Sequence, residues 1–221
     1  MVNKMSFRLY SYSFLAKALD YPTAESVKEL FNPELIEAIF SYKDALKKEE
    51  PPASRLRTAL DDFRSRMLEA VDLYSSQESY LLELQKEYTR LCHASKPRLL
   101  PLFESVYREG KLLQQSTVDV ARLYYQAGLQ LAEGFSLPPD HISLELEFMA
   151  YLCSQEIEAA ENNDSFVLDK AKEMQQKMLT EHLRHFVPAF AERIQKHATL
   201  GFYQAAGNFL EHFIDWELRS L

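Results

Sequence analysis

The sequence predicts an all-helical protein, a single globule of about ten helices. Three observations predict this fold class. Apolar residues recur at intervals of three and four, residues typical of helix ends stand between these stripes, and no stretch shows the strict alternation of a half-buried strand. With 221 residues, of which 47% are apolar, the chain is long enough to bury one substantial core.

The first part of the chain contains three amphipathic stripes. Asn32-Pro33 is typical of a helix start, because asparagine caps a helix and proline fits its first position. The polar, proline-containing stretch Lys48 to Arg55 is expected to be a loop. The stripes are Phe7, Tyr10, Phe14 and Ala18; Leu56, Leu60, Phe63, Met67 and Val71; and Leu81, Leu84, Tyr88 and Leu91.

The stretch from His93 to Thr117 breaks the helical rhythm near the middle of the chain. It is rich in apolar residues, yet Pro97 and Pro101 prevent one regular helix. We expect this segment either to pack as part of the fold or to be available to a ligand, and to join two helical parts. The next helix is expected to run from about Thr117 to Gly134.

The second half continues with helical spacing. The stripe that starts at Ile142 is widened by further apolar residues, which predicts a central, largely buried helix. Near the C-terminus, Pro188 should start or kink a helix, and a last aromatic stripe follows it. The stripes are Ile142, Leu146, Met149, Cys153 and Ile157, widened by Leu144, Phe148 and Leu152, and then Tyr203, Ala206, Leu210 and Phe213.

The charge and cysteine content narrow the class of partner. The formal net charge is -8, which argues against a nucleic-acid-binding surface and favours a basic partner. Cys92 and Cys153 form neither a CxxC pair nor a disulfide-rich pattern, so we expect a reducing, cytoplasmic compartment. The polar residues in the N-terminal stretch do not fit an export signal, and no stretch reaches the roughly 18 apolar residues of a membrane helix.

The stretch LPPDHISLELEFM, Leu137 to Met149, has the strongest local signal for a site. Asp140 precedes an apolar run, so we expect it to cap the following helix. His141 would then lie in the first turn with Glu145 one turn later, where the two side chains can meet. A zinc protease needs HExxH, whereas this helix offers only HxxxE, so a metal site is not expected here.

Other catalytic patterns are missing from the sequence. His182 and His185 lie three residues apart without an obvious third ligand. GxSxG, P-loop and GxGxxG motifs are absent, and the glycines are too scattered to bind a phosphate. The missing motifs do not exclude an enzyme, but they favour the prediction that this protein is not an enzyme and has no resident cofactor or metal.

Two motifs resemble a known family. EYTRLCHASKPRLLPLFESVY, Glu87 to Tyr107, together with LPPDHISLELEFMAYL, Leu137 to Leu152, resembles the TorD/DmsD/NarJ family of cytoplasmic chaperones for molybdenum-containing redox enzymes. The C-terminal stretch HFVPAFAERIQKHATLGFYQAAGNFLEHFI is similar to the last helices of that family. The resemblance extends from about Phe7 to the end of the chain.

The resemblance implies an all-helical chaperone that binds the twin-arginine signal peptide, or another N-terminal segment, of an apo-molybdoenzyme until its cofactor has been inserted. It also implies an N-terminal part to about residue 110, a hinge at about 110–117 and a C-terminal part at about 118–221. The protein would be a monomer or a domain-swapped dimer. By position, the peptide-binding residues would be Leu91, Pro101, Phe103, Glu104, Tyr107, Asp140, His141, Glu145 and Phe148.

The residues themselves support the same interpretation. A twin-arginine leader is a basic pair followed by an apolar stretch, so its receptor should combine carboxylates with an apolar groove. The two motifs supply Glu104, Asp140 and Glu145 beside apolar side chains. Two alternatives remain open: a scaffold that binds the folded body of a redox enzyme, and a metal- or nucleotide-dependent enzyme that uses His141 with Glu145, or His182 with His185.

Overall fold

The computed structural model describes residues 3–47, 49–74, 76–94, 96–130 and 137–220. Within these ranges the chain is helical, and its one isolated β-bridge joins Phe103 to His141. The predicted all-helical class is confirmed. Each helix in the same ranges is too short or too polar to cross a membrane.

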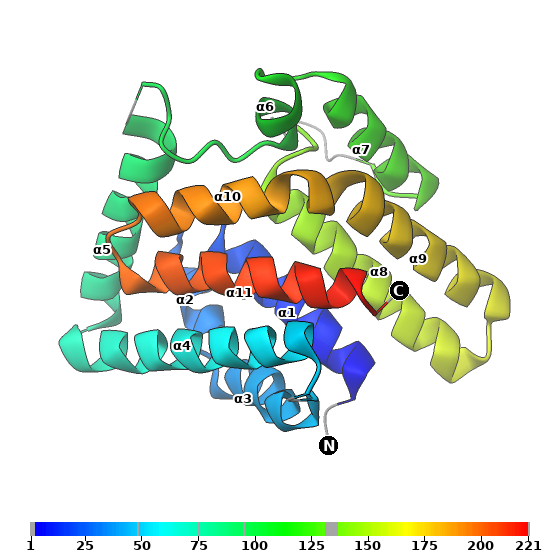
Figure 1. Ribbon diagram of the computed structural model, residues 1–221, viewed down its shortest axis with the longest axis horizontal. Helices are drawn as coiled ribbons and strands as arrows, with labels where there is room; N and C mark the ends of the chain where they lie inside the picture. The colour runs from blue at the N-terminus through cyan, green and yellow to red at the C-terminus, as the bar shows by residue number, and fades with distance from the viewer. Residues whose placement is uncertain (1–2, 48, 75, 95, 131–136, 221) are drawn as a thin grey trace.

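Figure 1 shows how the helices are arranged. In the first half they are α1 (Lys4–Ala18), α2 (Ala24–Leu30), α3 (Pro33–Ser41), the 3-10 turn η1 (Tyr42–Ala45), α4 (Pro51–Leu73), α5 (Gln77–Thr89) and the π-helical turn η2 (Arg90–Ala94). In the second half they are α6 (Glu104–Glu109), α7 (Gln115–Gln126), α8 (Ile142–Asn162), α9 (Ser165–Lys177), the π-helical turn η3 (Met178–Leu183), α10 (Arg184–His197) and α11 (Gly201–Leu218).

Side-chain caps explain where several helices begin. The Asn32 side chain accepts hydrogen bonds from two backbone N–H groups in the first turn of α3, and Pro33 is its first residue, as predicted. Thr23 and Ser76 cap α2 and α5 through reciprocal bonds with a serine three residues later. Each such cap stabilises its helix by about 1 kcal/mol, because the first N–H groups of a helix have no partner within it.

Two predicted boundaries are wrong. The loop expected at 48–55 is shorter, because α4 begins at Pro51, where a proline needs no N–H partner. The helix expected to end at Gly134 ends at Gln126, and Gly128 follows it with a φ of 82°, in the left-handed region that favours glycine. Gly134 itself lies outside the described residues.

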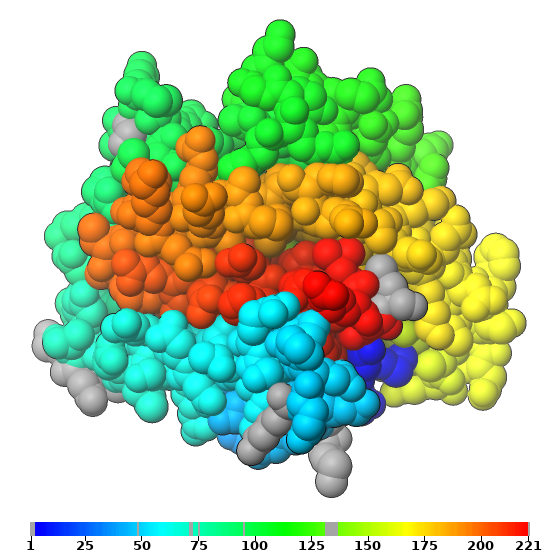
Figure 2. Space-filling model, viewed as in Figure 1, coloured from blue at the N-terminus to red at the C-terminus, as the bar shows by residue number. Residues whose placement is uncertain are grey.

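Helices from both halves of the chain share one hydrophobic core. Helix α1 packs against α8, and α11 packs against α4 and α10. The ring centroids of Phe7 in α1 and Phe213 in α11 lie 5.9 Å apart. On the face shown in Figure 2, α10 and α11 lie between α4 and the segment that contains α6 and α7. The division into parts near residue 110 stays a prediction.

A buried ion-pair network joins four of these helices. The Nε of Arg8 lies 2.9 and 2.8 Å from the two carboxylate oxygens of Glu217, and its Nη1 lies 2.8 Å from Glu156. Its Nη2 donates to the side-chain oxygen of Gln175 at 2.6 Å, and the Tyr12 hydroxyl donates to Glu217 at 3.0 Å. This set, the Arg8 network, connects α1 with α8, α9 and α11.

The run from α9 through η3 to α10 positions one further site residue. It is helical from Ser165 to His197, and η3 places His182 on the buried side while His185 is exposed. Pro188 lies inside α10, so the helix continues through it. Proline removes one hydrogen bond from a helix interior.

Candidate functional site

The two sequence motifs meet in space through the isolated bridge. The backbone N–H of Glu104 donates to the carbonyl of Asp140 at 3.0 Å, and that of Ile142 donates to the carbonyl of Leu102 at 2.8 Å. These bonds fix the start of α6 beside the start of α8. Three carboxyl groups from the two motifs, those of Glu104, Asp140 and Glu145, therefore lie in one buried region, which we call the carboxyl cluster.

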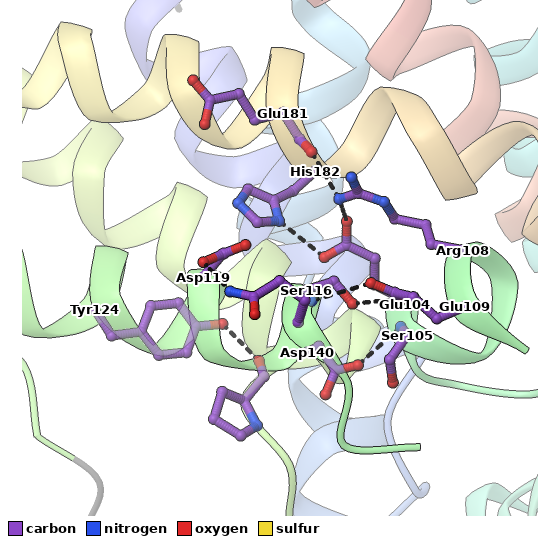
Figure 3. Close-up of polar contacts among 12 residues, drawn as sticks. Glu104, Ser105, Arg108, Glu109, Ser116, Asp119, Tyr124, Asp140, Glu181 and His182 are labelled. Atoms are coloured by element: carbon purple, nitrogen blue, oxygen red, sulfur yellow. Dashed lines mark hydrogen bonds and ion pairs between the residues drawn. The ribbon is translucent and has the colours of Figure 1, made fainter. Parts of the chain in front are cut away.

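Glu104 has a hydrogen-bond partner on each of its two oxygens (Figure 3). Its Oε1 lies 2.5 Å from Nη1 of Arg108, one turn later in α6, and its Oε2 lies 2.8 Å from Nδ1 of His182 in η3. The same Arg108 nitrogen donates to the carbonyl of Glu181 at 2.9 Å. Glu104 is fully buried, whereas the Arg108 side chain is 34% exposed. A guanidinium group thus approaches the cluster from the surface.

Asp140 differs from its predicted role as the cap of α8. Its Oδ2 accepts a hydrogen bond at 2.9 Å from the backbone N–H of Ser105, so it caps α6 (Figure 3). Helix α8 is capped by His141, whose Nδ1 accepts from the N–H of Ser143 at 3.2 Å. The prediction was wrong about which residue caps α8. The other Asp140 oxygen, Oδ1, is buried and has no hydrogen-bond partner among the described residues.

Glu145 is the least satisfied member of the carboxyl cluster. Its side chain is fully buried, and neither of its oxygens has a hydrogen-bond partner within the described ranges. Burial, together with the negative charges of Glu104 and Asp140, raises its pKa well above the usual value, which favours the neutral carboxyl group. The expected side-chain contact between His141 and Glu145 is therefore not formed.

His141 is also buried and lies against an aromatic ring. Its ring centroid lies 5.2 Å from that of Phe103 in an edge-to-face arrangement. Burial lowers the pKa of His141 below its usual value of 6.5, although Asp20 and Asp140 oppose this change. The imidazole is therefore neutral at pH 7, in agreement with its role as an acceptor for a backbone N–H.

Aromatic side chains surround the cluster. Phe148 packs against Tyr124 with ring centroids 4.7 Å apart, and the Tyr124 hydroxyl donates to the carbonyl of Pro139 at 2.9 Å. On the other side, the Tyr107 hydroxyl donates to the carbonyl of Pro101 at 2.8 Å. These bonds hold both proline-containing segments in place.

The structure brings most of the predicted site residues together, but it buries them. Only Pro101 and Tyr107 are partly exposed; the buried residues are Leu91, Phe103, Glu104, Asp140, His141, Glu145 and Phe148. Their role as peptide contacts stays a prediction. Two partners of Glu104 were missed. Arg108 was detectable from its spacing of four residues, whereas His182 lies far away in the sequence and gave no local signal.

The described residues of this site include no metal-binding cluster, and the large cavity described below lies elsewhere. In the part of the chain that the structure describes, no group of three or more histidine, cysteine or acidic side chains could hold a metal ion. His182 is bound to Glu104 and His185 is exposed, so these two histidines do not form a pair. The largest cavity found, about 630 Å³, lies between α2, α3, α4 and α5 and includes none of the predicted residues.

Comparison with known proteins identifies similar chains. Chaperone protein TorD of Vibrio cholerae serotype O1 is 28% identical over 157 residues, which cover 70% of each chain. Chaperone protein TorD of Photobacterium profundum is 28% identical over 204 residues, which cover 91% of this chain and 86% of the relative. A crystallised protein from Archaeoglobus fulgidus, provisionally assigned to redox enzyme maturation, aligns over 96% of both chains with a TM-score of 0.46 and 20% identity.

Comparison with sequence models of protein families shows the family to which this chain belongs. The sequence model of the family described as nitrate reductase delta subunit matches residues 49–192, well over half of the chain. This match contains both motifs of the carboxyl cluster. The chain therefore belongs to the nitrate reductase delta subunit family, the TorD/NarJ family that its two motifs resemble.

Proposed function

We propose that this protein is a chaperone for a molybdenum-containing redox enzyme, and that it binds the twin-arginine leader of the apo-enzyme at the carboxyl cluster. Family membership and the chaperone names of its relatives support the first part. The chemistry of the cluster supports the second. The observation that carries it is that Asp140 Oδ1 and both Glu145 oxygens have no hydrogen-bond partner among the described residues.

A guanidinium group would satisfy these oxygens. It has five N–H donors in a planar arrangement that matches a carboxylate, and buried carboxyl groups without partners cost free energy in the unbound protein. Arg108 already forms such a pair with Glu104 from the protein's own chain. The cluster is therefore chemically suited to arginine, while Phe103 and Phe148 supply neighbouring apolar surface.

Leader binding at this position requires local opening. Asp140 and Glu145 are buried, whereas the neighbouring residues Pro139 and Leu144 are partly exposed. We propose that the segment 110–117 acts as the hinge for this movement. Gly110 and Leu113 both have positive φ values, 81° and 58°, and leucine is rarely found in this region.

Calorimetric titration tests the proposal. Synthetic twin-arginine leaders of candidate molybdoenzymes would be titrated into the protein, each beside a leader whose arginine pair is replaced by alanine. We expect binding that depends on the pair and weakens at least about tenfold in Glu145→Gln and Asp140→Asn, because each variant removes a carboxylate that would pair with an arginine in the complex, at nearly constant side-chain shape.

The control is Asp119→Asn, which removes a partly exposed carboxylate on α7. Tight binding that ignores the arginine pair would move the contact to apolar surface. If no leader binds but the folded enzyme without its leader does, the protein is a scaffold for the body of its client.

A further inference from the structure

A second surface that combines acidic and apolar side chains, as the carboxyl cluster does, lies on the hairpin formed by α8 and α9. A groove of about 160 Å³ runs between these helices and is lined by Tyr151 and Gln155 from α8, and by Phe166, Val167 and Met174 from α9. The hairpin forms one edge of the molecule, at the lower right of Figure 1. An apolar space of about 150 Å³ holds a benzene ring, so this groove accommodates one large apolar side chain.

Phe166 is an exposed aromatic residue in the lining of the groove. Its side chain is 77% exposed although it lies in the first turn of α9 at the edge of the groove. Tyr125, two residues before the groove residue Ala127, is 73% exposed. Exposed aromatic side chains beside an apolar groove are typical of a surface that another molecule covers.

Acidic residues near the groove favour a basic partner. The stretch from Glu158 to Asp169, which forms the tip of the hairpin, contains four acids and no basic residue. All four acids, Glu158, Glu161, Asp164 and Asp169, are exposed. Glu158 follows Gln155 by three residues, so it extends the α8 wall of the groove toward the tip. Lys170 is the basic residue of the lining.

We infer that this hairpin is the first docking surface for the leader: basic residues approach the acidic tip and an apolar side chain enters the groove. The inference rests on the proposed function. It also answers a difficulty of that function, because the carboxyl cluster is buried and Arg108 lies over Glu104 in the unbound protein. A leader therefore needs an exposed acidic and apolar surface to bind first, before the carboxyl cluster opens.

Helix α8 connects the two surfaces. Glu145 and Gln155 lie on the same helix, at a separation of about 15 Å along its axis at 1.5 Å per residue. An extended peptide covers this distance with about five residues. One leader can therefore contact the groove and reach the carboxyl cluster without leaving the protein.

Rapid-mixing kinetics with the leader peptides test the inference, since a docking surface affects association and the carboxyl cluster affects dissociation. We expect Glu158→Lys combined with Glu161→Lys to lower the association rate constant about tenfold at low salt, with a smaller difference at high salt. Phe166→Ser should lower it several-fold at all salt concentrations. Glu145→Gln should instead raise the dissociation rate constant.

Matched variants control for charge and exposed apolar area. Glu37→Lys combined with Glu49→Lys changes the net charge equally on exposed residues outside the hairpin, and Leu73→Ser removes a leucine that is 76% exposed on α4. Both should associate at nearly the wild-type rate. If the hairpin variants also do so, this inference is wrong while leader binding stands. If the wild type binds no leader, the proposed function fails and the inference fails with it.

Discussion

Helix α8 carries two buried glutamates whose surroundings are opposite. Glu156 belongs to the Arg8 network, in which it accepts hydrogen bonds from Arg8 and from Gln175. Glu145, near the other end of the helix, has no hydrogen-bond partner among the described residues. In the Arg8 network, which joins four helices, the arginine contacts both glutamates, whereas three oxygens of the carboxyl cluster have no partner among the described residues.

We expect this difference to distinguish polar groups that hold helices together from polar groups that bind a ligand. A buried charge is tolerated when it is paired and hydrogen-bonded, and a partly satisfied network is less stable than an apolar core. The Arg8 network therefore fits a role in holding helices together. The carboxyl cluster lowers the stability of the unbound protein, and a ligand that completes its hydrogen bonds would recover that free energy.

The largest expected effect comes from breaking the satisfied network. Arg8→Met removes the cation from between Glu156 and Glu217 and leaves two buried carboxylates without their charge partner. We expect the free energy of unfolding to fall by about 3–5 kcal/mol. Urea denaturation followed by circular dichroism measures it, and a loss below about 1 kcal/mol would show that the network contributes little.

A pair of variants on α8 tests the comparison directly. Glu156→Met should destabilise the protein by about 2–4 kcal/mol, because Arg8 loses one of its two anionic partners. Glu145→Met, at nearly equal side-chain volume, should stabilise it by about 1–2 kcal/mol, because it removes a buried carboxyl group without partners. The same denaturation experiment measures both variants. Changes of opposite sign in the free energy of unfolding would support the contrast between Glu156 and Glu145, whereas equal losses of stability would contradict it.

Sequence patterns predicted the parts of this molecule that depend on neighbouring residues. The stripe from Leu56 to Met67 is buried in α4, and Asn32 caps α3. Such features follow from helical periodicity and from bonds within a single turn. The apolar stripe from Ile142 likewise forms a buried face of α8.

Contacts between distant segments were not predictable in the same way. Asp140 caps α6 because the bridge of Phe103 with His141 brings Ser105 next to it, although a capping acid beside Ile142 is the simpler local expectation. Arg8 is ordinary in sequence, and its partners lie on three other helices. The burial of the carboxyl cluster depends on the same packing of distant segments. The sequence motifs therefore indicated the candidate residues but not that they would be buried.

The raised pKa of Glu145 predicts proton release when a leader binds. In the unbound protein burial favours its neutral form, whereas an arginine in the complex would favour the carboxylate and lower the pKa. The proton is lost between the two pKa values, so affinity should rise with pH across that window, by up to about tenfold per pH unit, and level off above the pKa of the unbound state.

Calorimetry in buffers of different ionisation enthalpy measures the number of protons released. The Glu145→Gln variant provides the control, because an amide does not titrate in this range. If the wild type and this variant show the same pH dependence, Glu145 does not meet the arginine.

The smallest expected effect concerns Arg108, the arginine of the chain that already contacts the cluster. It is partly exposed and binds Glu104 and the carbonyl of Glu181, so it competes with an incoming guanidinium for the same oxygens. Arg108→Gln should therefore tighten leader binding by about two- to tenfold, within the range of a partly exposed ion pair. Arg122→Gln, which removes an exposed arginine paired with Asp119 on α7, should leave affinity unchanged. Weaker binding in Arg108→Gln would mean that Arg108 instead orders α6 for the ligand, and that Glu104 is a structural acid like Glu156.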